Sequence, residues 1–400
     1  MKILQLTKKF PFPLKDGESI AVTNLSKSIV AHGCEMTLLS MNTSKHFVDI
    51  DKLPNSYNHY KAIHTVYLDN RVSPLGAFFN LFSSDSYHVS RFDFKAYREK
   101  LIELLEAQEF DIIQLETLYL APYIETIKAH SSAKVVMRSH NVEFEIWNRI
   151  VESTSLLPKK WYLKLLTKKL RRFELERLPH YDALVTVTQR DLERYKNLGY
   201  NKKGMASPIG VDINRYKLQK NIQNGQSLSF IGSLDWMPNL DGLDWFLKEV
   251  FPNILNHYPS LTFNIAGRNT PKSIVDLAND NILIHGEVDS AIDFINNHSI
   301  MIVPLLSGSG MRVKILEGMA LGKVVISTSI GTEGIDALHK KSILIADRPA
   351  DFLECIKWLN DDPERMYEIE RNARAFIGEH FDEGMNAERL LNFYKSILAN

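Results

Sequence analysis

Residues 304–317 hold the combination of groups best suited to binding a charged ligand. The segment reads Pro-Leu-Leu-Ser-Gly-Ser-Gly-Met-Arg-Val-Lys-Ile-Leu-Glu, and it overlaps an apolar run at 300–306 that predicts a buried strand. A glycine-rich turn then precedes a helix expected to begin at Arg312. The free N–H groups and the dipole at a helix start favour an anion. Arg312 and Lys314 add positive charge and Glu317 could accept ribose hydroxyls, so the pattern predicts a nucleotide phosphate site.

Composition limits the kind of protein that this chain can be. Its 400 residues exceed one ordinary hydrophobic core and predict two domains. A hydrophobic share of 44% and a charged share of 24% are typical of soluble globular proteins. The net charge is zero, so no overall field would attract nucleic acid. The apolar runs are too short to span a membrane, and the N-terminus resembles a first strand rather than a signal peptide.

Strand-like and helix-like segments alternate along the chain, which predicts parallel sheets covered on both faces. The first series of expected strands is 2–7, 35–41, 62–68, 111–116, 134–140, 183–188 and 204–209. After a polar stretch at 216–227, which predicts a linker, the second series is 228–233, 261–267, 282–287, 300–306, 324–329 and 342–346. We therefore expect Rossmann-like domains at 1–215 and 226–380. The helix within 381–400 has no strand after it, and it could return to the first domain.

Ligands of open α/β sheets bind beyond the carboxyl ends of the strands, so residues that follow strands are the candidates. Gly17, before the first helix, could let a ligand approach the backbone closely, or it could belong to an ordinary turn. His140 ends the fifth strand, where it could donate to a sugar hydroxyl or a phosphate, or cap the next helix.

Further candidates follow the strands of the second series. Gly232 and Ser233 end its first strand, and Arg268 follows its second strand. The Arg268 side chain could stack on a nucleotide base or lie in solvent. Backbone groups near Val288, after the third strand, could contact the edge of a base.

Several of these segments together resemble glycosyltransferase family 4. The resemblance rests on Ile231-Gly-Ser-Leu-Asp-Trp-Met-Pro-Asn239, Ile265-Ala-Gly-Arg268, His285-Gly-Glu-Val288, residues 304–328, Arg138-Ser-His-Asn-Val-Glu143, 182–188 and 208–212, and it covers nearly the whole chain. It implies the α/β GT-B fold, with two Rossmann-like doubly wound domains that face a central cleft. The implied activity is a retaining transfer of sugar from a nucleotide-diphosphate sugar to an acceptor hydroxyl, in surface polysaccharide or glycoconjugate assembly. The donor is then a co-substrate, and neither a cofactor nor a metal is expected.

The resemblance also implies roles for individual residues. His140 matches a histidine beside the donor sugar, and Glu317 matches the second glutamate of a pair, which holds the ribose. The implied donor-binding set is Gly17, Gly232, Ser233, Arg268, Val288, Gly308, Ser309, Gly310, Met311, Arg312, Val313, Lys314 and Glu317.

Two features depart from the family pattern. Ser309 stands where the first glutamate of the pair is common. Ser233 and Asn239 stand where many members carry an arginine and a lysine on the diphosphate. Arg312 and Lys314 are the nearest substitutes, but side chains two apart on a helix face different ways. We therefore expect Arg312 to be the main catalytic cation, because the departing diphosphate still needs its charge stabilised.

Two other functions stay open at this point. A nucleotide-sugar epimerase or hydrolase of the same architecture would need acid and base groups that converge on the sugar, and His140 is the evident candidate. A non-catalytic nucleotide- or glycan-binding protein is compatible with Ser309.

A basic helix is expected at 156–178. It carries Lys159, Lys160, Lys164, Lys168, Lys169, Arg171 and Arg172, with apolar side chains at helical spacing. Such a helix could lie on an anionic membrane, which would favour a lipid-linked saccharide acceptor, or it could pack on the core with a solvated basic face. Cys34 and Cys355 form neither a metal-binding pattern nor a disulfide framework. We therefore expect a cytoplasmic protein, with peripheral contact to the inner face of the membrane as an alternative.

Overall fold

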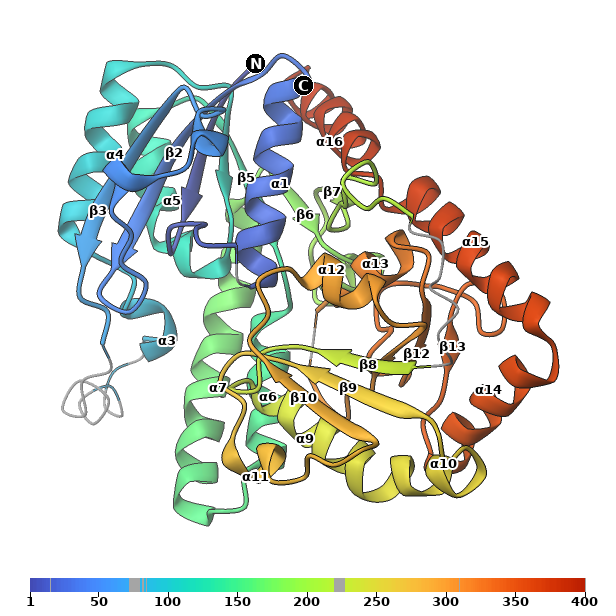
Figure 1. The fold of residues 1–400 in the computed structure, drawn as a ribbon. Helices are drawn as coiled ribbons and strands as arrows, with labels where there is room; N and C mark the ends of the chain where they lie inside the picture. The colour runs from blue at the N-terminus through green and yellow to red at the C-terminus, as the bar shows by residue number, and fades with distance from the viewer. Residues whose placement is uncertain are drawn as a thin grey trace. The chain divides into compact units, whose positions relative to one another are not determined.

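The chain folds as two compact units in the computed structural model, which describes residues 1–14, 16–71, 80, 83, 85–218, 227–308 and 310–399 (Figure 1). The first unit comprises Met1–Gly210 and Glu383–Asn400, and the second comprises Val211–Asp382. The expected linker at 216–227 lies partly outside the described residues. The chain therefore passes between the units twice, before Val211 and after Asp382.

The first unit is built on seven parallel strands in the order β3-β2-β1-β4-β5-β6-β7. Their bounds are β1 Lys2–Thr7, β2 Glu35–Thr43, β3 Ala62–Leu68, β4 Ile112–Leu115, β5 Lys134–Ser139, β6 Ala183–Thr186 and β7 Lys203–Ala206. All seven expected strands are present. The last one ends earlier than expected, since Pro208 has no N–H with which to continue a ladder.

Helices cover both faces of this sheet. Alternate strand residues, such as Leu4 and Ile3, point to opposite faces and enter two separate cores. One face is covered by α4 Lys95–Ala107, α5 Ile124–His130, α7 Leu157–Arg177 and α8 Gln189–Asn197, and the other by α1 Gly17–Ala31 and α16 Glu383–Leu398. The other described helices of this unit are α3 Tyr87–Ser90 and α6 Glu143–Ser153. Turns of 3-10 helix lie at Ile50–Lys52, Asn55–Tyr57, Leu118–Tyr123 and Leu178–His180.

The C-terminal helix α16 belongs to the first unit and lies beside α1 (Figure 1). Leu390 and Ile397 enter the same core as Leu25 and Ile29 of α1. The Tyr394 hydroxyl donates to Oε1 of Gln114 in β4 at 2.6 Å. The last helix of the chain thus completes one face of the first sheet.

The second unit is built on six parallel strands in the order β10-β9-β8-β11-β12-β13. The strands are β8 Ser227–Ile231, β9 Thr262–Ala266, β10 Ile282–Gly286, β11 Ile300–Val303, β12 Val324–Ser327 and β13 Leu344–Ile345. The helices are α9 Met237–Trp245, α10 Phe251–His257, α11 Lys272–Val275, α12 Ala291–Asn296, α13 Val313–Ala320, α14 Pro349–Asp361 and α15 Pro363–His380. A π turn, Phe246–Val250, separates α9 from α10 just before Pro252, which cannot donate an α-helical hydrogen bond.

Truncation of the Leu390 side chain tests whether α16 completes the first core. Leu390 is fully buried, so we expect Leu390→Ala to lower the free energy of unfolding of the first unit by about 2–5 kcal/mol. The exposed neighbour Glu388 gives the control, since Glu388→Ala should change it by less than about 0.5 kcal/mol. Hydrogen exchange resolved by peptide reports each unit separately. Equal protection of β1 amides in the two variants would contradict this account of the core.

Candidate functional site

The glycine-rich turn of the second unit leads directly into α13. Gly308 and Gly310 have φ values of 120° and 76°, in the left-handed region that glycine adopts at low cost. Ser309, between them, lies outside the described residues. Arg312 has an extended backbone and is the N-cap, so the helix begins one residue later than expected. Arg312 therefore lies outside the helical turn that holds Lys314, so helical spacing does not force their side chains to point in different directions.

Lys314 is half-buried beside the carboxyl end of β8. Its Nζ donates to the carbonyl oxygen of Ile231 at 3.2 Å and to Oδ1 of Asn239 at 2.8 Å. A Cβ on Gly232 would lie 3.1 Å from this Nζ, so the glycine leaves room for the ammonium group. Within the described ranges, Lys314 has no carboxylate in an ion pair. Burial, with the nearby charge of Arg312, lowers the pKa of Lys314 to about 7, as expected for a cation that lacks a counter-charge.

The Arg312 side chain hydrogen-bonds to the backbone of the turn that precedes α13. This side chain is buried, and its Nη1 donates to the carbonyl oxygen of Gly310 at 2.7 Å. The guanidinium lies over the ring of Trp236, 5.7 Å from the ring centre. Met311 and Val313 are also buried, so these two residues can offer a ligand only their backbone. Two cations and a helix N-terminus thus meet at one edge of the sheet.

Glu317 lies one turn further along α13. Its Oε1 accepts a hydrogen bond from the Tyr216 hydroxyl at 2.8 Å, and Oε2 has no hydrogen-bond partner in the described part of the chain. Burial raises the pKa of Glu317, while Tyr216 and Arg215 act in the opposite direction. No sequence pattern predicts this contact, since Tyr216 stands at the start of a polar stretch. One carboxylate oxygen is therefore fixed and the other is left for a hydroxyl.

Ser233 and Arg268 form a second polar group at the same sheet edge. Nε and Nη2 of Arg268 donate to Oγ of Ser233 at 3.2 and 3.1 Å, and Ser233 Oγ donates to Asp235. Arg268 is half-buried rather than fully solvated. Val288 follows β10 in the loop to α12, two strands away from β8.

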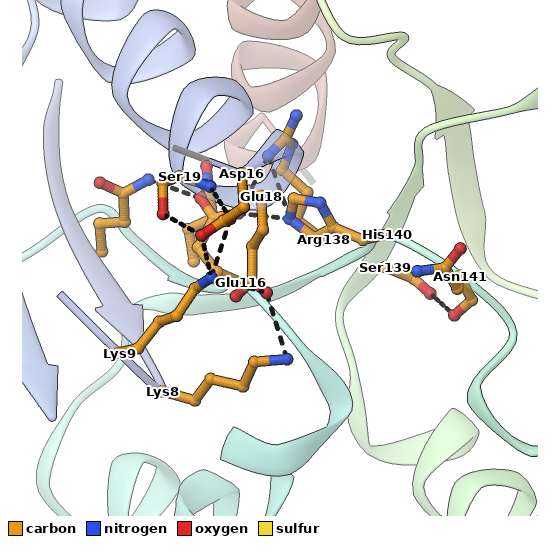
Figure 2. A network of polar contacts seen from close by, with 12 residues as sticks. Lys8, Lys9, Asp16, Glu18, Ser19, Glu116, Arg138, Ser139, His140 and Asn141 are labelled. Carbon is orange, nitrogen blue, oxygen red and sulfur yellow. Dashed lines mark hydrogen bonds and ion pairs between the residues drawn. The ribbon is translucent and has the colours of Figure 1, made fainter. Parts of the chain in front are cut away.

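His140 and Gly17 belong to the first unit, apart in the chain from the other candidates. Figure 2 shows His140 at the end of β5, with Glu116 and Arg138. Its Nε2 lies 3.1 Å from Oε2 of Glu116 and 3.3 Å from Nη1 of Arg138. Gly17 is the exposed first residue of α1.

Ion pairs surround the start of α1 (Figure 2). Asp16 caps the helix by accepting from the Ser19 N–H at 2.9 Å, and it pairs with Lys9 at 2.8 Å. Lys8 pairs with Glu18 at 3.3 Å. Burial alone would raise the pKa of Glu18, but the charges of Lys8 and Lys9, and to a smaller extent His140, lower it. The structure thus brings His140 and the Gly17 loop into one electrostatic neighbourhood.

Glu116 was not predicted as a functional residue. It follows β4 as His140 follows β5, and it is 1% exposed. The signal was available: a carboxylate at a strand end, directly after the buried run of β4. The sequence analysis included Glu116 in the expected strand at 111–116. In the structure Glu116 lies one residue after the end of β4.

The expected basic helix is α7, and its two sides differ. Leu163, Leu166, Leu170 and Glu174 are buried against the first unit. Leu157 and Trp161 are 78% and 65% exposed and lie on the opposite side, as do the exposed residues Lys164 and Lys168. No helix among the described residues is both long and apolar enough to cross a bilayer.

Sequence comparison gives two relatives and one family match. Residues 225–362 match the family described as "Glycosyl transferases group 1". An "Uncharacterized 44.6 kDa protein in cps region" of Klebsiella pneumoniae is 24% identical over 95% of this chain and 96% of its own length. A protein of Bacillus subtilis (strain 168) named "Putative glycosyltransferase YtcC" is 23% identical over 79% of this chain and 80% of its own.

Structure comparison finds similar folds over the whole chain. A sucrose-phosphate synthase from Thermosynechococcus elongatus has a TM-score of 0.71 at 14% identity, and the match covers all of both chains. Anabaena HepE in complex with UDP has a TM-score of 0.70 at 13% identity, over 99% of this chain and 100% of its own. These neighbours and the two parallel sheets confirm the predicted GT-B fold class. Residues 225–362 thus carry a domain of the glycosyl transferases group 1 type, which supports a glycosyltransferase.

Proposed function

We propose that this chain is a retaining glycosyltransferase of family 4 that transfers a sugar from a nucleotide-diphosphate sugar to an acceptor hydroxyl. The observation that carries the proposal is the half-buried Lys314, which lies beside Arg312 at the start of α13 and has no carboxylate counter-charge within the described residues. A diphosphate at this edge would supply the missing negative charge. The relative from a cps region supports a place in polysaccharide or glycoconjugate assembly.

Different groups of the second unit bind different parts of the donor. The first N–H groups of α13, Lys314 and Arg312 hold the diphosphate, and the open Oε2 of Glu317 accepts from the ribose hydroxyls. Asn239 replaces a lysine of the family pattern, yet its Oδ1 holds the Lys314 ammonium at the same strand end. Lys314, rather than Arg312 alone, therefore compensates for the uncharged Ser233 and Asn239. HepE has been solved with UDP and with UDP-glucose, which supports a donor of this class.

In the proposed reaction the acceptor oxygen bonds to the anomeric carbon on the face from which the diphosphate departs. The bond between that carbon and the phosphate oxygen breaks, and the acceptor proton passes to the departing oxygen. The two cations stabilise the developing charge of the leaving group. His140 interacts with the donor sugar in this scheme, and no cofactor or metal takes part.

Substitution of Glu317 tests the ribose contact. Glu317→Ala removes both acceptor oxygens, so we expect the affinity for a nucleotide-diphosphate sugar to fall by roughly 10- to 150-fold, the equivalent of about 1.5–3 kcal/mol. Isothermal titration calorimetry measures the change, and Arg312→Ala should cause a comparable loss. The matched control is Glu368→Gln, on the exposed side of α15. If both site variants bind as tightly as the wild type, the donor site lies elsewhere.

The depressed pKa of Lys314 predicts a pH-dependent affinity. A diphosphate binds the ammonium form, which is complete well below the free pKa of about 7. As pH rises above 7, binding must first protonate the amine, so affinity should fall by up to about tenfold per unit. Titration between about pH 6 and about pH 9 with a nucleotide-diphosphate sugar, whose esterified diphosphate does not titrate there, measures this slope. Lys314→Met should bind weakly with little slope, and an equally steep slope in that variant would assign the effect to another group.

The exposed side of α7 suggests where the acceptor is found. We propose that Leu157, Trp161 and the lysines of α7 lie on an anionic membrane surface, and that the acceptor is a lipid-linked saccharide. Apolar side chains next to basic ones match the boundary between acyl chains and anionic headgroups.

Flotation with vesicles tests the membrane contact. The wild type should float with vesicles that contain anionic lipid and not with neutral ones. Reversal of Lys164 and Lys168 to Glu should abolish flotation, since each basic residue contributes about 1 kcal/mol. A control with Lys128 and Lys196 changed to Glu has the same net charge, but these exposed residues lie on α5 and α8. Equal loss in both double variants would exclude α7 as the contact.

A further inference from the structure

The carboxylate of Glu116 lies within hydrogen-bond distance of four side chains, three of which donate to it. The Gln5 amide donates to Oε1 at 2.5 Å, and the Gln114 amide donates to the same oxygen. Arg138 Nη1 donates to Oε2 at 3.0 Å, and His140 Nε2 lies 3.1 Å from that oxygen. The two oxygens of a carboxylate can accept about four hydrogen bonds, so the group is saturated.

Two tyrosines fix the glutamine amides that face Glu116. The Tyr60 hydroxyl donates to Oε1 of Gln5 at 2.8 Å, and the Tyr394 hydroxyl donates to Oε1 of Gln114 at 2.6 Å. Since both amide oxygens are occupied, both NH2 groups must point to Glu116. Tyr394 comes from α16 and Tyr60 from the segment before β3. Elements far apart in the sequence therefore hold this carboxylate in one position.

Glu116 stays ionised in spite of its burial. Burial alone would raise its pKa, but the Arg138 charge and the contact with His140 lower the pKa of Glu116 to about 2. An ionised carboxylate can only accept hydrogen bonds. The proton between Glu116 and His140 must then lie on Nε2, because an unprotonated Nε2 would face the lone pairs of Oε2. Nη1 of Arg138 has a second N–H and lies 3.3 Å from Nε2, but a lone pair on Nε2 would still face the ionised carboxylate at the shorter distance of 3.1 Å.

The other ring nitrogen of His140 is left for a ligand. Within the described residues Nδ1 has no hydrogen-bond partner, and the ring is 10% exposed. Other ionisable groups interact with this ring at longer range, namely Glu18 of α1 and Glu143 of α6, and both carboxylates also interact with the charge of Lys8. None of them contacts the ring directly in the described structure.

We propose that Glu116 is the positioning residue of His140: its carboxylate fixes the ring with the proton on Nε2 and leaves Nδ1 to meet the ligand. The inference rests on the proposed function for the role of His140 in sugar transfer. Arg138 acts one step further back, since it keeps Glu116 in the ionised form that His140 needs. The carboxylate that follows β4 thus sets the tautomer of the imidazole that follows β5. Carboxylates orient metal-binding histidines in the same way in other proteins.

Nitrogen-15 NMR of the imidazole tests the tautomer directly and does not depend on activity. In the full-length wild type above the titration range of histidine, the His140 signals should show the Nε2–H form. In Glu116→Gln, whose amide can present either its oxygen or its NH2 group, the Nδ1–H form should appear. Glu174→Gln makes the same change at another buried carboxylate of the first unit and should leave the tautomer unchanged. A wild type in the Nδ1–H form, or an unchanged tautomer in Glu116→Gln, overturns the proposal.

Kinetics separate a positioning role from a merely structural one. We expect Glu116→Gln to lower kcat at least tenfold while the affinity for donor, which the second unit provides, stays within about twofold. Glu116→Asp keeps the charge beside Arg138 but withdraws it from His140, so it should fold as the wild type does and still lose kcat. Full kcat in Glu116→Asp together with a retained Nε2–H tautomer contradicts the need for this side-chain length. His140→Ala with full activity would instead contradict the proposed function, and the NMR result would still decide whether Glu116 sets the ring.

Discussion

A parallel sheet that helices cover on both faces has no place for unpaired polar groups except at the ends of its strands. This constraint governs both units of the chain. The strand β11 is apolar and buried along its whole length, so its side chains can only pack. Functional polar groups are found at the carboxyl ends of the strands, where the loops begin. Glu116, His140, Gly232 and Ser233 all stand at that boundary.

The two units deal with buried charge in opposite ways. In the first, the carboxylate of Glu116 is saturated by donors, and its environment is complete without a ligand. In the second, the Lys314 ammonium bonds to a carbonyl and an amide oxygen and pairs with no carboxylate of the described residues, so burial lowers its pKa to about 7. A saturated network resists rearrangement, whereas an under-compensated cation binds an anion strongly. The first arrangement suits the orientation of a side chain, and the second suits the capture of a ligand.

The sequence predicted where the strands occur along the chain and which residues form the turn before α13, because both depend on local pattern. Continuous apolar runs identify buried strands wherever they fold, and the spacing of glycines before Arg312 identifies the turn. Contacts across the fold could not be read in this way. Tyr216 pairs with Glu317 from a polar stretch with no periodicity, and Asn239 holds Lys314 from another helix. No helix was predicted at α15, and the π turn between α9 and α10 was not predicted either, since neither depends on hydrophobic pattern alone.

The return of the chain to the first unit affects the order in which the protein can be completed. Val211 and Phe381 are joined by a backbone hydrogen bond of 2.8 Å, so the second unit is an insertion whose two ends meet. About 170 residues of this insertion separate β7 from α16. At a synthesis rate of about 5–20 residues per second, the first sheet waits roughly 10–35 s at the ribosome before Tyr394 and Leu390 arrive. The unit made first is therefore the unit finished last, and until then part of one apolar face of its sheet, which α1 covers only in part, stays accessible to chaperones.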